Sequence, residues 1–536
     1  MTQEEKKTES PTTFTSSPDI DPDDDLDKLV SSVGGHGCFQ ILVWSVGFGT
    51  KASVAGVFLY MSFAGATPDW WCLLGNPAEN GSDITNDSVS GRWNGTDLLK
   101  SCYVNGSRCP AYRFDKSMRT VVGEWSLVCD QKWVSSTITS VQMAGVLLGA
   151  LVAGQAADIW GRKKTSILML IGQVLFSLVN AFSPDWIVFI ITRCGAGFCG
   201  GGYLVPYFAL TMEFTDINWR TVLGAIPAWP IGASLLALVA WLLHDWQYIG
   251  IYVAAFTVPF LVAWFFMPES VRWLLVHGRV EEAQAILCRA ARQNGKPQPD
   301  ATRTRALASA EASKARADRT YTFLDLFRTG ALARRSFLLF FVWFSSGAVF
   351  YFLAFGAENL SGNLYLNLFL LSIVDAPAQL ISAYLNNKIG RRWTAFALYM
   401  LAGVTSVAVI ITKALDVSGS VVNGLVIFSK LAMGGGWAAV LVFSAENFPT
   451  VVRNIGYGAC NTASRVGAIL APQLVFLYTT SPAVPYAIVA ALMVLSSLAF
   501  LKIRETNAKA LEDVIETRDK AVHETHAAGD TQDEKF

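Results

Sequence analysis

The most informative stretch of this sequence reads GQAADIWGRK over residues 154–163 and joins two long apolar segments. A related stretch, NKIGRR at residues 387–392, also joins two apolar segments and lies 229 positions further along the chain. A second motif, Glu-x6-Arg, begins at Glu213 and again at Glu446, 233 positions later. Two motifs repeated at nearly one offset predict two related halves. Paired halves are typical of membrane proteins that rock two helical bundles around a central site.

The composition is that of a membrane protein. Hydrophobic residues make up 52% of the chain and charged residues only 16%. A helix needs about 20 apolar residues to cross the hydrocarbon core of a bilayer. The sequence therefore predicts an all-α membrane protein with twelve transmembrane helices, near residues 39–60, 134–156, 165–182, 186–212, 221–243, 247–267, 336–356, 364–385, 394–412, 421–443, 454–479 and 483–501.

The predicted spans form two bundles of six helices, over residues 37–267 and 336–501. Between them lies a hydrophilic loop, residues 268–335, in which Val280–Gln293 is expected to form a surface helix. A second hydrophilic insertion, residues 61–133, separates the first two spans. The chain is thus expected to be two bundles that carry one polar insertion on each side of the membrane.

Basic residues in the short loops predict the orientation of the chain, because such loops face the cytosol. They follow the second, fourth, eighth and tenth spans and are Arg162, Lys163, Lys164, Arg220, Lys388, Arg391, Arg392 and Arg453. Both termini and the 268–335 loop are therefore expected in the cytosol. The terminal segments, 1–36 and 502–536, are polar and expected to be disordered. No cleavable signal peptide is visible, so the first span is expected to direct insertion.

The 61–133 insertion carries signals of an extracellular domain. It contains four Asn-x-Ser/Thr sequons, at Asn80, Asn86, Asn94 and Asn105. It also contains four cysteines, Cys72, Cys102, Cys109 and Cys129. Together they predict glycosylation and two disulfides formed in an oxidising compartment. Four cysteines allow three pairings, and the sequence does not choose among them.

Several motifs resemble those of the major facilitator superfamily and, within it, the organic cation/anion/carnitine transporter family. The superfamily resemblance rests on Gly154-x3-Asp158-x2-Gly161-Arg162-Lys163 and its second copy. The family resemblance rests on Glu124-Trp125-x-Leu-Val-Cys129, Pro268-Glu-Ser-x-Arg272-Trp273-Leu, Ala445-Glu446-x-x-Pro449-Thr-Val-Val-Arg453-Asn454 and Thr462-Ala-Ser-Arg465-Val-Gly467-x-Ile-Leu-x-Pro472. The resemblance implies alternating-access transport of small organic ions at the plasma membrane. Ile159 and Val271 depart from the family's motifs, as does the small number of loop cysteines.

Four of the charged residues inside the predicted spans are candidates for a functional role, because a charge there costs at least ~2.5–3.5 kcal/mol and so normally faces a cavity or a partner. Asp375 and Lys430 are expected to form an ion pair with a gating or packing role, as the family pairs an acid and a base on these helices. Lys51 is expected to face the cavity, although it could instead extend toward the interface. Arg465 is the strongest candidate for a substrate ligand, since a guanidinium binds carboxylates in a bidentate manner. The resemblance implies arginine here in carriers of anions and zwitterions.

Aromatic residues on the spans are expected to line the substrate site with Arg465 and Lys51. The candidates are Trp229, Trp343, Phe350, Tyr351 and Trp437. Such rings accept flat hydrophobic bodies and, by cation–π attraction, quaternary ammonium groups. The alternative is that any single ring faces lipid or the protein core.

The repeated motifs supply the expected gating residues. They are Asp158, Gly161, Arg162, Glu213 and Arg220 in the first half, and Asn387, Gly390, Arg391, Glu446 and Arg453 in the second. An acid can interact with the positive N-terminal end of a helix. The resemblance places Asp158 at the start of the eleventh span, near Arg453. The basic members could alternatively be topology signals only.

No catalytic triad, metal-ligand set or nucleotide-binding loop occurs in the sequence, so no enzyme activity, metal or cofactor is expected. The formal net charge of zero predicts no nucleic-acid partner. The expected partners are the lipid bilayer, a small organic ion and a coupling ion or counter-substrate. Organic anions or carnitine-like zwitterions are the leading substrates. An organic cation carrier remains open, since Asp375 could serve a cation, and so does a non-transporting receptor.

Overall fold

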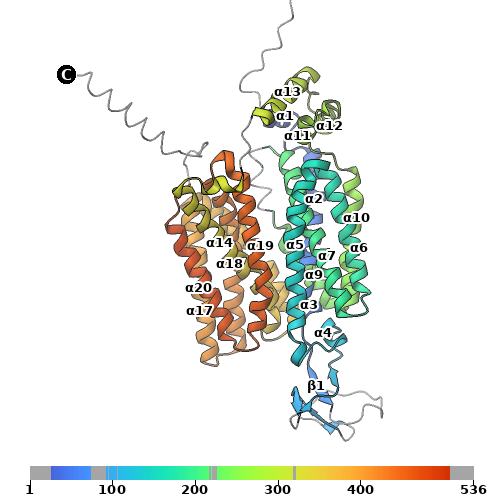
Figure 1. Cartoon of the computed structure of the whole chain (residues 1–536), viewed down its shortest axis with the longest axis vertical. Helices are drawn as coiled ribbons and strands as arrows, with labels where there is room; N and C mark the ends of the chain where they lie inside the picture. Colours follow the sequence, from blue (N-terminus) through green and yellow to red (C-terminus); the bar gives the residue numbers. More distant parts are fainter. Residues whose placement is uncertain are drawn as a thin grey trace, which may run out of the picture.

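The computed structural model describes residues 26–73, 92–93, 96–104, 107–216, 219, 226–317 and 322–506. Its helices form two bundles that stand side by side (Figure 1). The first bundle consists of α2 (Cys38–Leu59), α3 (Met61–Ala64), α5 (Trp133–Trp160), α6 (Arg162–Ala181), α7 (Trp186–Glu213), α9 (Ala228–Leu243) and α10 (Trp246–Phe266). The second consists of α14 (Gly330–Phe355), α15 (Leu364–Ile373), α16 (Asp375–Ile389), α17 (Arg391–Ala414), α18 (Gly419–Asn447), α19 (Arg453–Leu477) and α20 (Ala483–Leu501).

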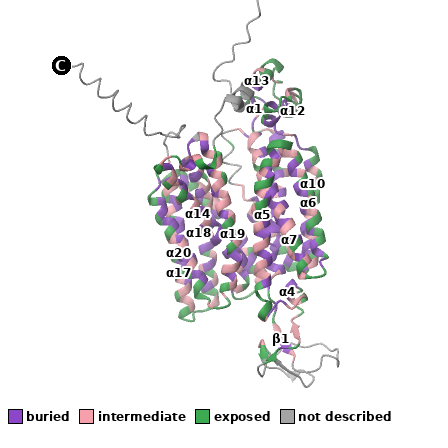
Figure 2. Ribbon diagram, in the orientation of Figure 1, coloured by how far each residue is buried: buried purple, intermediate pink, exposed green. Residues whose placement is uncertain are grey.

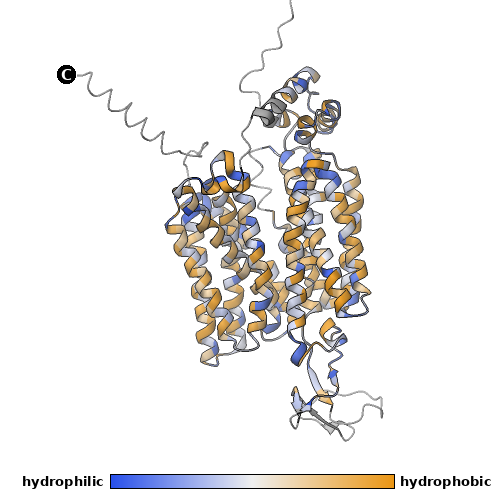
Figure 3. Cartoon of the chain, in the orientation of Figure 1, coloured by the Kyte–Doolittle hydropathy of each residue, from blue (hydrophilic) through white to orange (hydrophobic). Residues whose placement is uncertain are grey.

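Among the described residues, ten helical segments are long and apolar enough to cross a membrane. The two remaining predicted spans correspond to α9 and α19. Helix α9 has 16 described residues, and α19 has 25 but contains the polar positions that make it a candidate for substrate contact. Apolar residues cover the sides of both bundles (Figure 3), and buried residues fill their interiors (Figure 2). The chain is a multi-pass membrane protein of the twelve-helix type.

One end of the first bundle carries the β-strands, and we call it the sheet end (Figure 1). Its strands are β1 (Trp70–Leu73), β2 (Arg92–Trp93), β3 (Thr96–Leu99), β4 (Tyr103–Val104), β5 (Ser107–Arg108) and β6 (Tyr112–Phe114). Four of them form an antiparallel sheet in the order β2-β3-β1-β6, and β4 pairs with β5. The short helix α4 (Val121–Glu124) and the 3-10 turn η1 (Cys129–Gln131) lead into α5.

Two disulfides join the cysteines of this insertion. They connect Cys72 with Cys109 and Cys102 with Cys129. The first bridge joins β1 to the segment after β5, and the second joins the residue before β4 to η1, so the insertion is held as one unit. The four sequons predicted to be glycosylated lie outside the described residues.

The opposite end, which we call the helical end, carries α1 (Leu26–Ser32), α11 (Val271–Val276), α12 (Val280–Gln293) and α13 (Ala301–Ala317). Helix α12 has the bounds that the sequence predicts. Residues 26–36, expected to be disordered, are folded here, because Leu29 and Val33 are buried. The amide of Asn294 also donates to the Val33 carbonyl and to the side chain of Gln40. The expectations for 1–25 and 507–536 lie outside the described residues.

The two repeated turns have the same backbone geometry. Gly161 joins α5 to α6 with φ 103°, and Gly390 joins α16 to α17 with φ 95°. A Cβ atom at Gly161 would lie 2.3 Å from Glu269, and one at Gly390 would lie 2.8 Å from Glu505. Glycine is therefore required at both turns for its backbone freedom and for its missing side chain. The 3-10 turns η2 (Phe323–Phe327), η3 (Gly356–Asn359) and η4 (Thr450–Val452) complete the second half.

Candidate functional site

Arg465 lies on α19 between the two bundles. Its Nη1 atom donates to the hydroxyl of Tyr351 on α14, at 3.3 Å, and its Cζ atom lies 6.0 Å from the centroid of the Phe58 ring on α2. Helices α14 and α19 approach closely because residue 347 is a glycine. A Cβ atom at Gly347 would lie only 2.0 Å from the Ser464 carbonyl oxygen. The Nε atom of Arg465 is buried and has no hydrogen-bond partner in the described chain. The guanidinium therefore retains a free donor for a ligand.

A row of aromatic rings extends from Arg465 into the second bundle. Phe350 contacts Tyr351 at 5.4 Å and Trp437 at 5.7 Å between ring centroids, and Trp437 contacts Trp343 at 5.8 Å. Trp343 is only 2% exposed and donates from Nε1 to Ser444 at 2.8 Å. The predicted rings of this half thus contact one another, but Trp343 is buried and packs against Trp437.

The first bundle contributes an aromatic pair and a lysine. The ring of Trp229 on α9 packs edge-on against that of Phe58 at 5.4 Å. Lys51 lies seven residues before Phe58 on α2, which places both on one face of the helix. Lys51 has no hydrogen-bond or ion-pair partner among the described residues. Lys51 therefore lies on the same face of α2 as Phe58, the ring that Arg465 approaches to 6.0 Å, and adds a second positive charge on that face.

Asp375 and Lys430 lie directly behind the aromatic row. Lys430 Nζ is 3.1 Å from Asp375 Oδ2, and the two side chains are only 2% and 5% exposed. Asp375 begins α16 after the interruption at Val374 that separates it from α15. Lys430 Nζ also lies 3.2 Å from the centroid of the Phe350 ring. The pair neutralises its own charge and contacts the aromatic row from the back.

A buried arginine holds the region where α2 ends. Arg193 on α7 is 1% exposed, donates from Nη2 to Gln142 Oε1 at 2.6 Å and also donates to the Val57 carbonyl oxygen. Gln142 in turn donates to the carbonyl oxygen of Phe58 at 3.1 Å. The Arg193 guanidinium lies 4.6 Å from the Tyr60 ring centroid. These contacts fix the segment that carries Phe58.

The gating motif of the first half forms a linked network at the helical end. Arg162 forms ion pairs with Asp158 at 3.2 Å and with Glu213 at 3.7 Å. Ser270 donates its hydroxyl proton to Glu213, and Glu269 accepts from the Lys163 backbone N–H at 3.0 Å. The carboxylate of Glu269 therefore caps the start of α6, where an acid is stabilised by the helix dipole.

The second half repeats this network. Arg391 pairs with Glu446 at 3.3 Å, and Thr506 donates to Glu446 at 2.5 Å. Glu505 accepts from the Arg391 backbone N–H at 3.1 Å, as Glu269 does in the first half. Glu269 and Glu505 were not among the predicted site residues. A looser repeat, Pro268-Glu-Ser270 after the sixth span and Arg504-Glu-Thr506 after the twelfth, is the sequence signal that could have indicated them.

The predicted gating residues Asp158, Asn387 and Arg453 lie near helix ends. The Asp158 side chain is 76% exposed, so in this conformation it does not bury itself against the start of α19. Asn387 is exposed, and Arg453 is the half-buried first residue of α19. Arg220 lies outside the described residues. The predicted contact between Asp158 and the α19 N-terminus therefore stays a prediction for another conformation.

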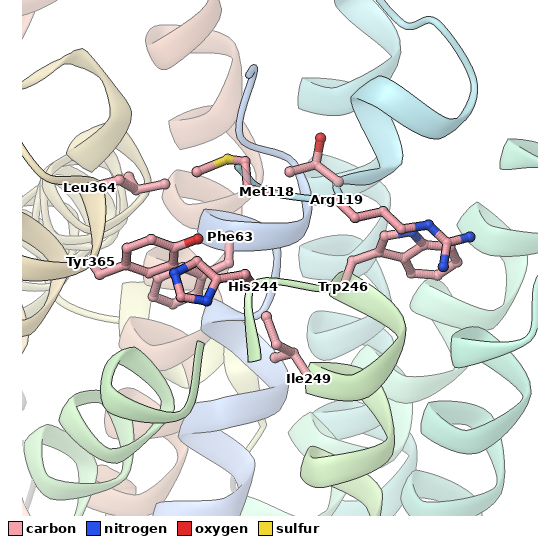
Figure 4. Close-up of a pocket in the computed structure, with 9 residues that line it drawn as sticks. Phe63, Met118, Arg119, His244, Trp246, Ile249, Leu364 and Tyr365 are labelled. Atoms are coloured by element: carbon pink, nitrogen blue, oxygen red, sulfur yellow. The ribbon is translucent and has the colours of Figure 1, made fainter. Parts of the chain in front are cut away.

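At the sheet end the two bundles meet. Ser140 on α5 donates to the Ile469 carbonyl oxygen of α19 at 2.8 Å, and Gln473 donates to Ser140 at 3.1 Å. Figure 4 shows Tyr365 of α15 beside Phe63 and His244 of the first bundle, with ring centroids 5.8 and 5.1 Å apart. Toward the helical end the ribbons stand further apart (Figure 1). These contacts close the Arg465 region toward the sheet end.

Comparison with known proteins agrees with this architecture. The family described as "Sugar (and other) transporter" matches residues 92–517. The chain is 32% identical over 516 residues to the "Organic cation transporter protein" of Drosophila melanogaster, covering 90% of this chain and 92% of that one. It is also 31% identical over 412 residues to the "Organic cation/carnitine transporter 2" of Rattus norvegicus, covering 76% and 72%.

This chain belongs to solute carrier family 22 of the major facilitator superfamily. The fold of this solute carrier also matches the structure described as "Inward open conformation of the xylose transporter XylE from E. coli". The TM-score is 0.63 at 14% identity, and the match covers 87% of this chain and 98% of that one. Its membership of this family makes it a transporter of organic ions and not an enzyme.

Proposed function

We propose that this solute carrier moves small organic anions or carnitine-like zwitterions across the plasma membrane by alternating access. Arg465 carries the proposal. It lies between the bundles, next to an aromatic row, with a buried donor that lacks a partner in the described chain. A guanidinium in such surroundings favours a carboxylate and repels a bare cation. Phe350 and Trp437 offer flat surfaces for the organic body of the substrate.

The charges near the cavity support the same preference. Arg465 and Lys51 have no acidic partner among the described residues, whereas Asp375 is already paired with Lys430. The surroundings of the aromatic row are therefore net positive. A zwitterion such as carnitine also fits, because its carboxylate would meet Arg465 and its ammonium group would meet a ring face.

The two ends of the bundles indicate how the chain is oriented in the membrane and how it opens and closes during transport. The basic short loops lie at the helical end, which we place in the cytosol, and the sheet end is then extracellular. In this arrangement the sheet end is closed by contacts such as Ser140 to Ile469. We infer that the helical end closes in the opposite state, where Asp158 meets the start of α19.

An organic cation remains the second candidate, because the fly relative is described as an organic cation transporter. Uptake into proteoliposomes separates the two. We expect saturable uptake of p-aminohippurate or carnitine, with and without sodium, and little uptake of tetraethylammonium. Uptake of tetraethylammonium with none of either carboxylate would reverse the substrate assignment. If none of the three compounds showed saturable uptake, the proposed transport of organic ions would be contradicted.

A further inference from the structure

A separate polar pocket lies between the two bundles at the sheet end. It is bounded by α3, the first turns of α5, η3 and α19. Its polar lining consists of Ser62, Ser135, Ser136, Thr139 and Glu358. None of these residues belongs to the Arg465 region described above. The pocket therefore gathers four hydroxyl groups and one carboxylate from both halves of the chain.

Ser62 is a lining residue whose hydroxyl has no hydrogen-bond partner among the described residues. Its side chain is 6% exposed, and its Oγ atom is buried. A buried polar group left unsatisfied costs about 1–3 kcal/mol. An ion bound beside the Ser62 hydroxyl would satisfy it and remove this cost.

Glu358 supplies the charge and the access. Its Oε2 atom accepts from the Thr67 backbone N–H at 3.3 Å, so this carboxylate already bridges the two halves. The Glu358 side chain is exposed, so an ion can reach it from solution at the sheet end. Lys132 interacts electrostatically with the same carboxylate.

The chemistry of the lining selects one class of ion. Carboxylate, hydroxyl and carbonyl oxygens are the ligands of hard cations. Calcium sites draw on several carboxylates, whereas this pocket has one, partly offset by Lys132. The balance of charge therefore suits a monovalent cation.

We propose that a sodium ion binds in this pocket, with oxygens of Glu358 and Ser62 among its ligands, and holds the sheet end closed. Ser62 belongs to the first half and Glu358 to the second, so an ion that binds both stabilises the arrangement in which they are together. A ligand shifts a conformational equilibrium by its preference for one state. Sodium on the side of the sheet end therefore favours the state that is open toward the helical end.

Thermal unfolding of the purified full-length protein tests the binding. Sodium chloride is replaced stepwise by choline chloride or potassium chloride at constant ionic strength. We expect Tm to rise with sodium, because a ligand that binds only the folded state stabilises it. Glu358→Gln and Ser62→Ala should each remove most of this rise. Ser183→Ala is the matched control, since Ser183 is 7% exposed at the sheet end, just after α6, and its hydroxyl donates to the Val179 carbonyl oxygen of that helix.

The proposal is wrong if the wild type shows no rise specific to sodium, if potassium acts equally, or if both variants respond as the wild type does. These outcomes do not depend on which solute is carried, so they are distinct from a failure of the proposed function.

Cross-linking tests closure. The rings of Phe63 and Tyr365 lie 5.8 Å apart across the two halves, so Phe63→Cys with Tyr365→Cys reports whether the sheet end is closed. We expect sodium to raise the cross-linking rate several-fold, and Glu358→Gln to remove this dependence. A rate that ignores sodium would contradict the holding role.

Discussion

The ammonium group of Lys430 lies 3.2 Å from the centroid of the Phe350 ring. The same group forms the ion pair with Asp375, so one side chain links a buried charge pair to the aromatic row beside Arg465. A desolvated cation–π contact contributes about 2 kcal/mol. A change in the charge pair is therefore expected to alter the position of the Phe350 ring, although neither Asp375 nor Lys430 needs to touch the substrate.

Breaking this pair from one side should do more harm than removing both charges. Asp375→Asn or Lys430→Gln leaves a single buried charge, which costs about 3–5 kcal/mol in a folded protein. We expect either variant to lose most of its surface expression or uptake, and the double variant to recover part of the loss. Uptake at matched surface expression measures this, with Asp416→Asn, at an exposed position, as the control. Strictly additive losses would mean that the two charges act separately.

Glu269 should matter through the helix that it caps. Glu269→Gln keeps the shape but removes the charge that accepts from the Lys163 backbone, at a cost of about 1 kcal/mol. We expect reduced uptake with a changed balance between inward- and outward-facing states, measured by cysteine accessibility at each end. Glu282→Gln is the control, since Glu282 is exposed on α12 and pairs only with Arg279. Equal behaviour of the two variants would remove Glu269 from the gating network.

Arg193 should support the fold of the first bundle. Arg193→Gln removes the donors that hold the Val57 carbonyl oxygen and Gln142, so buried acceptors are left unpaired. We expect a lower Tm and weak surface expression, with Arg193→Lys intermediate because it keeps the charge and loses the planar fork. A Tm equal to that of the wild type in Arg193→Gln would show that the network is dispensable.

The ectodomain should be glycosylated and disulfide-bonded. Enzymatic deglycosylation of surface-expressed protein is expected to shift its mobility on a gel. Peptide mapping without reduction is expected to connect Cys72 with Cys109 and Cys102 with Cys129. Loss of a native disulfide costs about 2–5 kcal/mol in small extracellular domains, so Cys72→Ser should lower expression. Four free thiols and no mobility shift would contradict the proposed orientation.

Much of this architecture could be predicted from the sequence, because the hydrophobic spans and the repeated turns are local signals. The charged pair of Asp375 and Lys430 could be proposed since buried charges need partners. The role of Phe58 could not, because an apolar residue on a span carries no sign of which way it faces. The partners of Arg193, Gln142 and the Val57 carbonyl oxygen, could not be predicted either, because they lie on other helices. Glu269 and Glu505 lie after the sixth and twelfth spans, and only the folded chain brings them to the starts of α6 and α17.

The folded segment at residues 26–36 shows a different limit. Its apolar residues, Leu26, Leu29, Val30 and Val33, have the spacing of one face of a helix, but they lie in a terminal segment that is polar as a whole. Leu29, Val30 and Val33 are buried in the folded chain, and Asn294, just after α12, donates to the Val33 carbonyl oxygen. This contact joins residues 261 positions apart, and hydropathy along one segment does not reveal it.

The central claim is that Arg465 sets the preference for anions, and charge reversal at this position tests it most directly. The measurement is initial uptake of p-aminohippurate, carnitine and tetraethylammonium at matched surface expression. Arg465→Lys keeps the charge without the fork and is expected to lower anion uptake about tenfold, equivalent to about 1.4 kcal/mol. Arg279→Lys, an exposed exchange at the helical end, is the control. Arg465→Asp is expected to abolish anion uptake and to admit the cation, whereas undiminished anion uptake in Arg465→Asp would contradict the account.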